Sequence, residues 1–250
     1  MASGLIVTAA AVVAVILVLV AIDRRTGDVR TLDHEVASTI FNMVGVLYAV
    51  LLAFVVVQVW ETGNEAQDYT QAEASDASQI YFTARALPQP QRGQLTHLAR
   101  AYVRTVADRE WPLMAHGRTS PQAVADVARM RVSILAYHPT DYRGQILMSQ
   151  TLDSINQLVD ARRNRTSRAT SPVPTIMWIG LIAGAVITVG FTLSFGYGRL
   201  VHQILMCSAV AALLAFILWL VYEMGHPYSG PTGIGPDAFR EVLDKFRRYS

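Results

Sequence analysis

The stretch FNMVGVLYAVLLAFVVVQVWETGNEAQDY, residues 41–69, joins a long apolar run to a polar, acidic continuation. Its apolar part is long enough to cross the roughly 30 Å hydrocarbon core of a bilayer as a helix. No proline interrupts the stretch, and residues rich in Ala, Gln and Glu follow, which favour helix despite Gly63. The stretch therefore predicts one helix that leaves the bilayer and continues as an acidic stalk.

Three further uncharged apolar runs approach or reach membrane-spanning length. With residues 40–60, the runs at residues 5–22, 173–197 and 204–222 give four predicted spans. The first run lacks the basic residues that precede a secretory signal core, and it is longer than such a core. Only 16% of the residues are charged, against roughly 25% in soluble domains. We therefore expect an all-α membrane protein with four transmembrane helices and a helical extramembrane domain between spans two and three.

The predicted organisation has four parts. They are a transmembrane hairpin at residues 1–60, a helical extramembrane domain at 61–172, a second hairpin at 173–222, and a turn with a tail helix at 223–250. Within the insert, Ser120 and Pro121 are typical of a helix start, while the prolines in residues 86–93 and 137–144 break helices. No segment alternates like a strand.

Basic residues near the spans give conflicting evidence on orientation. One group sits in the short loops, at Arg24, Arg25, Arg30 and Arg199. The larger group flanks the insert and the tail, at Arg162, Arg163, Arg165, Arg168, Arg240, Lys245, Arg247 and Arg248. Because Lys and Arg concentrate on the cytoplasmic side, the larger group predicts cytoplasmic termini and a cytoplasmic insert.

The second span has one small or polar face and one bulky face. On a helical wheel, Asn42 shares a face with small and medium residues, whereas leucines and Phe54 lie opposite. Small residues let membrane helices approach closely, so packing against another helix is one interpretation. The other is a pore whose aliphatic positions form a hydrophobic constriction. The predicted pore-lining residues are Asn42, Val46, Ala49, Val50 and Ala53.

Charges of both signs flank this predicted pore. Glu61 and Glu65 follow the second span directly, and a ring of subunits would multiply each of them. A basic cluster precedes the third span and could attract anions. The predicted pore-mouth charges are Glu61, Glu65, Arg162, Arg163, Arg165 and Arg168.

Several segments together resemble bacterial bestrophin-like membrane proteins. They are VLYAVLLAFVVVQVWE, AEASDASQIY, YVRTVADREWPLM, PVPTIMW and HPYSGPTGIGPDAF, at residues 46–61, 72–81, 102–114, 172–178 and 226–239. The resemblance covers nearly the whole chain in order and spacing. It implies a multi-pass protein of the bacterial inner membrane, a homo-oligomer that is most often pentameric, and a distant relation to bestrophin chloride channels.

The resemblance also assigns roles to particular residues. The bestrophin neck, formed by apolar residues one helical turn apart, would fall on Asn42, Val46 and Val50, although aromatic side chains are missing there. The calcium clasp that follows the fourth span in bestrophins would have only Asp237 as an acid. Because calcium needs six or more oxygen ligands, we predict no such site.

The sequence shows little sign of catalytic, metal-binding or nucleic-acid-binding residues. Glu110 beside Trp111 is interpreted as a buried structural carboxylate, since no nucleophile or partner acid stands at a recognisable spacing. His34 lies between two acids, but adjacent helical residues point apart, so no metal site is predicted. The net charge of +2 is too small to indicate nucleic acid. We predict no catalytic residue, no enzyme activity and no cofactor.

These observations favour a homo-oligomeric ion channel with its pore along the second transmembrane helix, with anions favoured over cations as the ions it conducts. Its expected partners are the lipid bilayer, further copies of itself and inorganic ions. The alternative is a non-conducting membrane scaffold or sensor whose helical domain binds a cytoplasmic partner.

Overall fold

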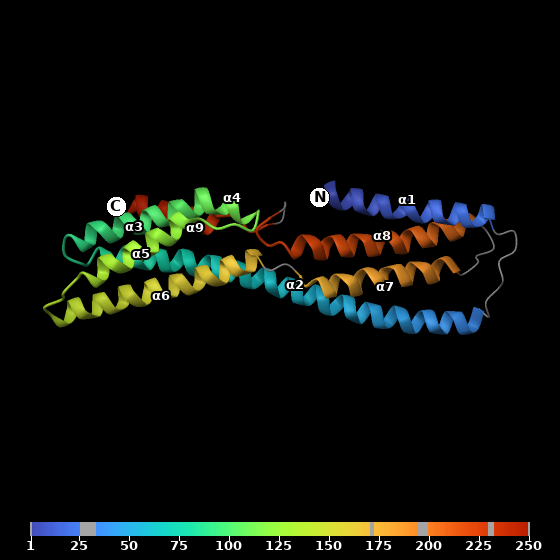
Figure 1. Cartoon of the computed structure of the whole chain (residues 1–250), viewed down its shortest axis with the longest axis horizontal. Helices are drawn as coiled ribbons and strands as arrows, with labels where there is room; N and C mark the ends of the chain where they lie inside the picture. The colour runs from blue at the N-terminus through green and yellow to red at the C-terminus, as the bar shows by residue number, and fades with distance from the viewer. Residues whose placement is uncertain (1, 26–33, 171–172, 195–199, 230–232, 250) are drawn as a thin grey trace. The chain divides into compact units, whose positions relative to one another are not determined.

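The computed structural model describes residues 2–25, 34–170, 173–194, 200–229 and 233–249. Every regular element among them is helical (Figure 1). The chain divides into two compact units, each described here by itself. Unit 1 comprises Met1–Glu61 and Val173–Gly225, and unit 2 comprises Thr62–Pro172 and His226–Ser250.

Unit 1 contains α1 (Ala2–Arg25), the first part of α2 (His34–Ala84), α7 (Thr175–Ser194) and α8 (Leu200–Met224). The helix α8 packs against both α1 and α7. Val15 of α1 meets Cys207 and Ala211 of α8 in one buried cluster. A second buried cluster joins Val55 and Val59 of α2 to Leu181 and Val221.

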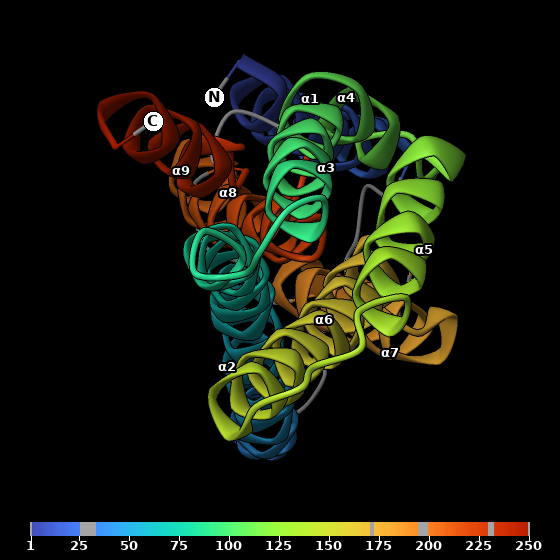
Figure 2. The same cartoon turned by 90° about the vertical axis from the view of Figure 1, so that its left-hand side faces the viewer.

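Unit 2 is a helical bundle with one large core. Its helices are the second part of α2, α3 (Gln91–Thr105), α4 (Trp111–Met114), α5 (Pro121–Leu135), α6 (Tyr142–Thr170) and α9 (Asp237–Arg248). A widened π-helical turn, η1 (Val106–Glu110), connects α3 to α4. Figure 2 shows α2, α3, α5 and α6 in end view. The tail helix α9 is amphipathic and buries Phe239, Val242 and Phe246 in this core.

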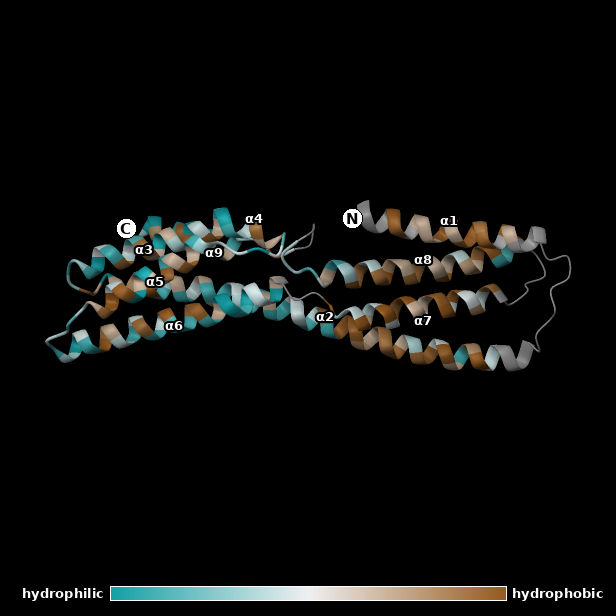
Figure 3. Cartoon of the chain, in the orientation of Figure 1, coloured by the Kyte–Doolittle hydropathy of each residue, from teal (hydrophilic) through white to brown (hydrophobic). Residues whose placement is uncertain are grey.

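The predicted continuation of the second span is confirmed. The helix α2 extends over 51 residues and passes through Gly63 without a break. Figure 3 shows its residues change from hydrophobic to hydrophilic along its length. A Cβ atom at Gly63 would meet no atom within 4 Å, so that glycine is not required by packing.

Three described helices are long and apolar enough to cross a membrane, namely those containing Ser38–Ala84, Thr175–Leu193 and Val201–Met224. The predicted first span lies within α1. Among the residues that the structure describes, the apolar part of this helix is Ala9–Val18, which is shorter than the three membrane-spanning candidates. Residues 195–197 of the predicted third span lie outside the described residues. Ser120 occupies the position before α5 as predicted, but its hydroxyl makes no capping hydrogen bond.

Candidate functional site

The predicted pore face of α2 is uncovered in the single chain. The side chains of Val46 and Val50 are 64% and 49% exposed. Asn42, Ala49 and Ala53 are exposed as well. All five predicted pore-lining residues therefore remain available to lipid, to a second subunit or to a water-filled path.

A different face of α2 makes the contacts within unit 1. Tyr48 is buried, and its hydroxyl donates a 2.9 Å hydrogen bond to the carbonyl oxygen of Leu181 on α7. Its ring lies over Gly184, where an added Cβ would come within 2.2 Å of a ring carbon. Further along α2, Val55 and Val59 are buried in the contact with α7 and α8. Within unit 1 these contacts leave the predicted pore face uncovered, together with Leu47 and Phe54 of the bulky face, which are 71% and 72% exposed.

Unit 2 contains a buried cluster of two arginines and two glutamates. Arg162 of α6 binds Glu110 through two hydrogen bonds of 2.6 and 2.7 Å. Arg165, fully buried one turn further on, binds both Glu73 of α2 and Glu110 at 2.6 Å. Opposite charges are equal in number, so the cluster is neutral overall. It ties α2, η1 and α6 together.

Polar and aromatic groups complete this cluster. The hydroxyl of Tyr102 donates to Glu73, and the backbone N–H of Ser120 donates to Glu110 at 2.9 Å. The guanidinium of Arg165 lies 5.2 Å from the ring centre of Trp111 and 5.7 Å from that of Phe239. Such cation–π contacts are strongest when the cation is desolvated. Because its hydrogen-bonding groups are satisfied, the cluster can remain charged in the core.

The ionisation of the cluster follows from these contacts. Burial raises the pKa of Glu110, but hydrogen bonds and charge from Arg162 and Arg165 outweigh burial and hold that pKa below its usual value. Burial lowers the pKa of Arg165, and Glu73 more than compensates, so that pKa lies above its usual value. The prediction that Glu110 is a buried structural carboxylate beside an aromatic is confirmed.

Comparison with known families decides which family this helical architecture represents. A model of the bestrophin-like domain matches residues 6–239. The chain belongs to the bestrophin-like family. This confirms the resemblance found in the sequence, and it identifies a multi-pass membrane protein.

Solved structures support the bestrophin-like fold. A mutant of a membrane protein aligns with a TM-score of 0.67 at 14% identity, over 98% of this chain and 97% of that chain. Two structures of a bacterial bestrophin homologue from Klebsiella pneumoniae align with TM-scores of 0.64 and 0.62, both at 14% identity. They cover 97% of this chain and 97% and 95% of the homologue. No curated protein matches the chain significantly.

The predicted pore-mouth charges of this bestrophin-like chain fall into three groups. Arg162 and Arg165 are neutralised within the buried cluster. Glu65 and Arg168 pair with each other at 2.5 Å on the surface of unit 2. Glu61 and Arg163 are exposed and form no ion pair with a described residue. Pore-mouth roles for all six residues stay predictions.

Sequence reasoning missed the pairing of Arg165 with Glu73, although a signal was present. Ile155, Leu158, Arg162 and Arg165 follow one another at spacings of three, four and three residues. This spacing places the arginines on the same helical face as the apolar core residues. Charged residues at core positions predict buried partners of opposite charge. The identity of those partners, from α2 and η1, requires the fold.

Proposed function

We propose that this bestrophin-like protein assembles into a ring around the small face of α2 and conducts ions along it. The supporting observation is the exposure of Asn42, Val46 and Val50 in the single chain, while Tyr48 and Val55 make the contacts with the other helices. Polar side chains facing lipid are costly, so Asn42 favours a subunit contact or a water-filled path over lipid.

The proposed topology has four spans, with α1 as the first. In this topology the termini and unit 2 lie in the cytoplasm, as the larger group of Lys and Arg residues indicates. The family membership supports a channel-forming role. The second part of each α2, which belongs to unit 2, would then lie in the cytoplasm.

Assembly is the first expectation. A ring, which the family resemblance implies is a pentamer, would cover the apolar and small residues that one chain leaves exposed on α2. We expect native mass spectrometry in mild detergent to give a single multiple of the chain mass. A monodisperse monomer, together with no cross-linking in native membranes, would contradict the proposal.

The constriction is the second expectation. Replacing Val50 with serine adds a hydroxyl to the proposed neck, which should hydrate it and raise basal conductance in planar bilayers. Leu51→Ser is the matched control, because Leu51 lies beside Val50 in the chain but on another side of α2. Unchanged conductance in a correctly assembled Val50→Ser protein argues against this pore face. A non-conducting scaffold would show no current in any variant.

Selectivity is the third expectation. We propose a preference for anions, because Glu61 points about 100° away from Asn42 on the helical wheel and salt screens its charge. Glu61→Gln should therefore shift the reversal potential only slightly, whereas Arg163→Gln should reduce anion flux. Arg143→Gln, an exposed change on the same helix α6, is the control. A strong cation preference that Glu61→Gln abolishes would show that the assumed helix orientation is wrong.

A further inference from the structure

Aromatic side chains from three helices of unit 1 lie at one level. Val59 of α2 and Val221 of α8 belong to one buried cluster. Trp60 and Tyr222 are the residues that follow them in the chain. Trp178, near the start of α7, packs against the same cluster, and its ring centre lies 6.3 Å from that of Tyr222. These contacts place Trp60, Trp178 and Tyr222 together at one end of unit 1.

The first charged residues of α2 and α8 appear at this level. Residues 36–60 of α2 and 200–222 of α8 include no Asp, Glu, Lys or Arg. The residues that follow them directly are Glu61 and Glu223. On both helices, therefore, an uncharged segment ends at an aromatic residue and an acid comes next.

The surface on the apolar side of this level is hydrophobic on all three helices. The side chains of Phe54 on α2, Val186 on α7 and Leu213 on α8 are 72%, 65% and 60% exposed. An order of exposed apolar, aromatic and charged residues matches the passage from the hydrocarbon through the headgroups to water. Lipid therefore fits the apolar surface, and the headgroup region fits the aromatic level.

The chemistry of the aromatic side chains agrees with this assignment. Trp60 and Tyr222 are more than half exposed, and Trp178 is half-buried beside Tyr222. Tryptophan and tyrosine combine an apolar ring with one polar group, so they are most stable where apolar and aqueous surroundings meet. Trp219, one turn before Tyr222 on α8, adds a further ring close to the same level.

The aromatic level is one-sided in the described part of unit 1. Besides Trp60, Trp178, Trp219 and Tyr222, the described residues of this unit include one Trp or Tyr, namely Tyr48. Tyr48 is buried against α7 and does not mark a surface level. Membrane proteins commonly carry such residues at both interfaces. A single level would hold the helices at a fixed depth from one side.

From these observations, we infer that Trp60, Trp178 and Tyr222 bind the headgroup region of one leaflet and set the depth of unit 1 in the bilayer. In the topology proposed above this is the cytoplasmic leaflet. The inference needs only the membrane location of unit 1 and does not depend on ion conduction. Val50 lies about 15 Å before Trp60 along α2, which is half of the roughly 30 Å hydrocarbon core. The proposed constriction would then lie near the centre of the bilayer.

Spin labels on single cysteines measure this depth in the full-length protein. In vesicles of phosphatidylethanolamine and phosphatidylglycerol, oxygen relaxes labels in the hydrocarbon and a water-soluble nickel chelate relaxes labels in water. Phe54 and Leu213 lie about 9 and 14 Å from the aromatic level along their helices. The oxygen-to-nickel ratio should be about fivefold higher or more at Phe54→Cys and Leu213→Cys than at Asn64→Cys, which lies beyond Trp60.

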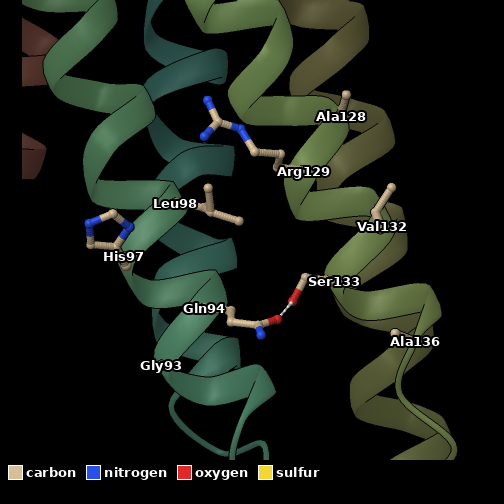
Figure 4. A pocket seen from close by; sticks show the side chains of 9 residues that line it. All are labelled: Gly93, Gln94, His97, Leu98, Ala128, Arg129, Val132, Ser133 and Ala136. Atoms are coloured by element: carbon tan, nitrogen blue, oxygen red, sulfur yellow. Dashed lines mark hydrogen bonds between the residues drawn. The ribbon is translucent and has the colours of Figure 1, made fainter.

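A matched pair of valines separates lipid contact from simple exposure. Val132 of α5 is 68% exposed and, with Leu98, lines an apolar groove between α3 and α5 in unit 2 (Figure 4). Val186 of α7 is similarly exposed at 65%. A label at Val186→Cys should be relaxed by oxygen, and one at Val132→Cys by the nickel chelate. The native Cys207 is buried, and the chain without an added cysteine measures its background.

Replacing the exposed aromatic residues tests whether they set the depth. Trp60→Leu/Tyr222→Leu extends the apolar surface, so the label at Phe54→Cys should sink and its oxygen-to-nickel ratio should rise about twofold. The exchange Trp60→Tyr/Tyr222→Trp keeps the interfacial preference and should leave the ratio unchanged. Tyr142→Leu, an exposed aromatic residue of unit 2, should also leave it unchanged.

Each outcome decides the inference. The expected ratios, with a rise in the double leucine variant alone, support it. Access of the nickel chelate to Phe54→Cys or Leu213→Cys places the interface elsewhere and overturns it. Labels relaxed by neither probe would show that a neighbouring subunit covers these positions, which overturns the lipid contact. An unchanged ratio in the double leucine variant overturns the anchoring role. Native mass and bilayer currents test the proposed channel separately, so each can fail without the other.

Discussion

Replacing Arg165 with methionine should lower the free energy of unfolding of unit 2 by about 3–5 kcal/mol, because it leaves two buried carboxylates without their shared cation. Glu73 and Glu110 are both fully buried and both bind this guanidinium. Methionine fills much of the arginine volume, so the loss reflects charge more than a cavity. Urea unfolding in detergent, followed by circular dichroism, measures the difference.

A control and a compensating variant make this prediction specific. Arg163→Met changes an exposed neighbour on α6 and should alter stability by about 0.5 kcal/mol or less. Adding Glu73→Gln to Arg165→Met removes the carboxylate that has lost its cation, while Glu110 keeps its pairing with Arg162, and should recover a large part of the loss. Equal destabilisation by Arg163→Met, or no loss in Arg165→Met, would contradict a structural role for the cluster.

Gly184→Ala should destabilise unit 1 by about 1–3 kcal/mol, because the added methyl group would overlap the ring of Tyr48. That ring cannot easily move, since its hydroxyl is bonded to Leu181 and its side chain is buried. The helix α7 offers a matched control at Gly190, where an added Cβ meets nothing within 4 Å. Gly190→Ala should be neutral or slightly stabilising.

The thermal unfolding midpoint in detergent checks both glycine variants. If Tyr48 is the obstacle, Tyr48→Leu combined with Gly184→Ala should be less destabilised than the sum of the two single changes, since the smaller side chain leaves room. If the losses of stability in the two single variants simply add in the double variant, Tyr48 is not the side chain that obstructs the added methyl group. The comparison also tests the orientation of α2, because the Tyr48 contact sets which face is left for the proposed pore.

Sequence patterns alone predicted the helical class, the apolar spans now seen in α2, α7 and α8, and the uninterrupted passage of α2 through Gly63. These features depend on local properties, namely the length and periodicity of apolar runs and the positions of proline. The sequence also predicted the tail helix and the buried Glu110 beside Trp111. The bestrophin-like family followed from the order of short motifs.

The folded chain was needed to show which charged side chains are exposed and unpaired and which face of α2 is covered. Arg162, Arg163, Arg165 and Arg168 read alike in sequence, yet two are buried with glutamates from α2 and η1 and one pairs with Glu65. Residues up to 92 positions apart meet in this cluster, and no local pattern specifies such pairings. Likewise, Tyr48 covers one side of α2 because a glycine on α7 leaves space for its ring. Ionisation and exposure depend on neighbours in space, and the fold alone supplies them.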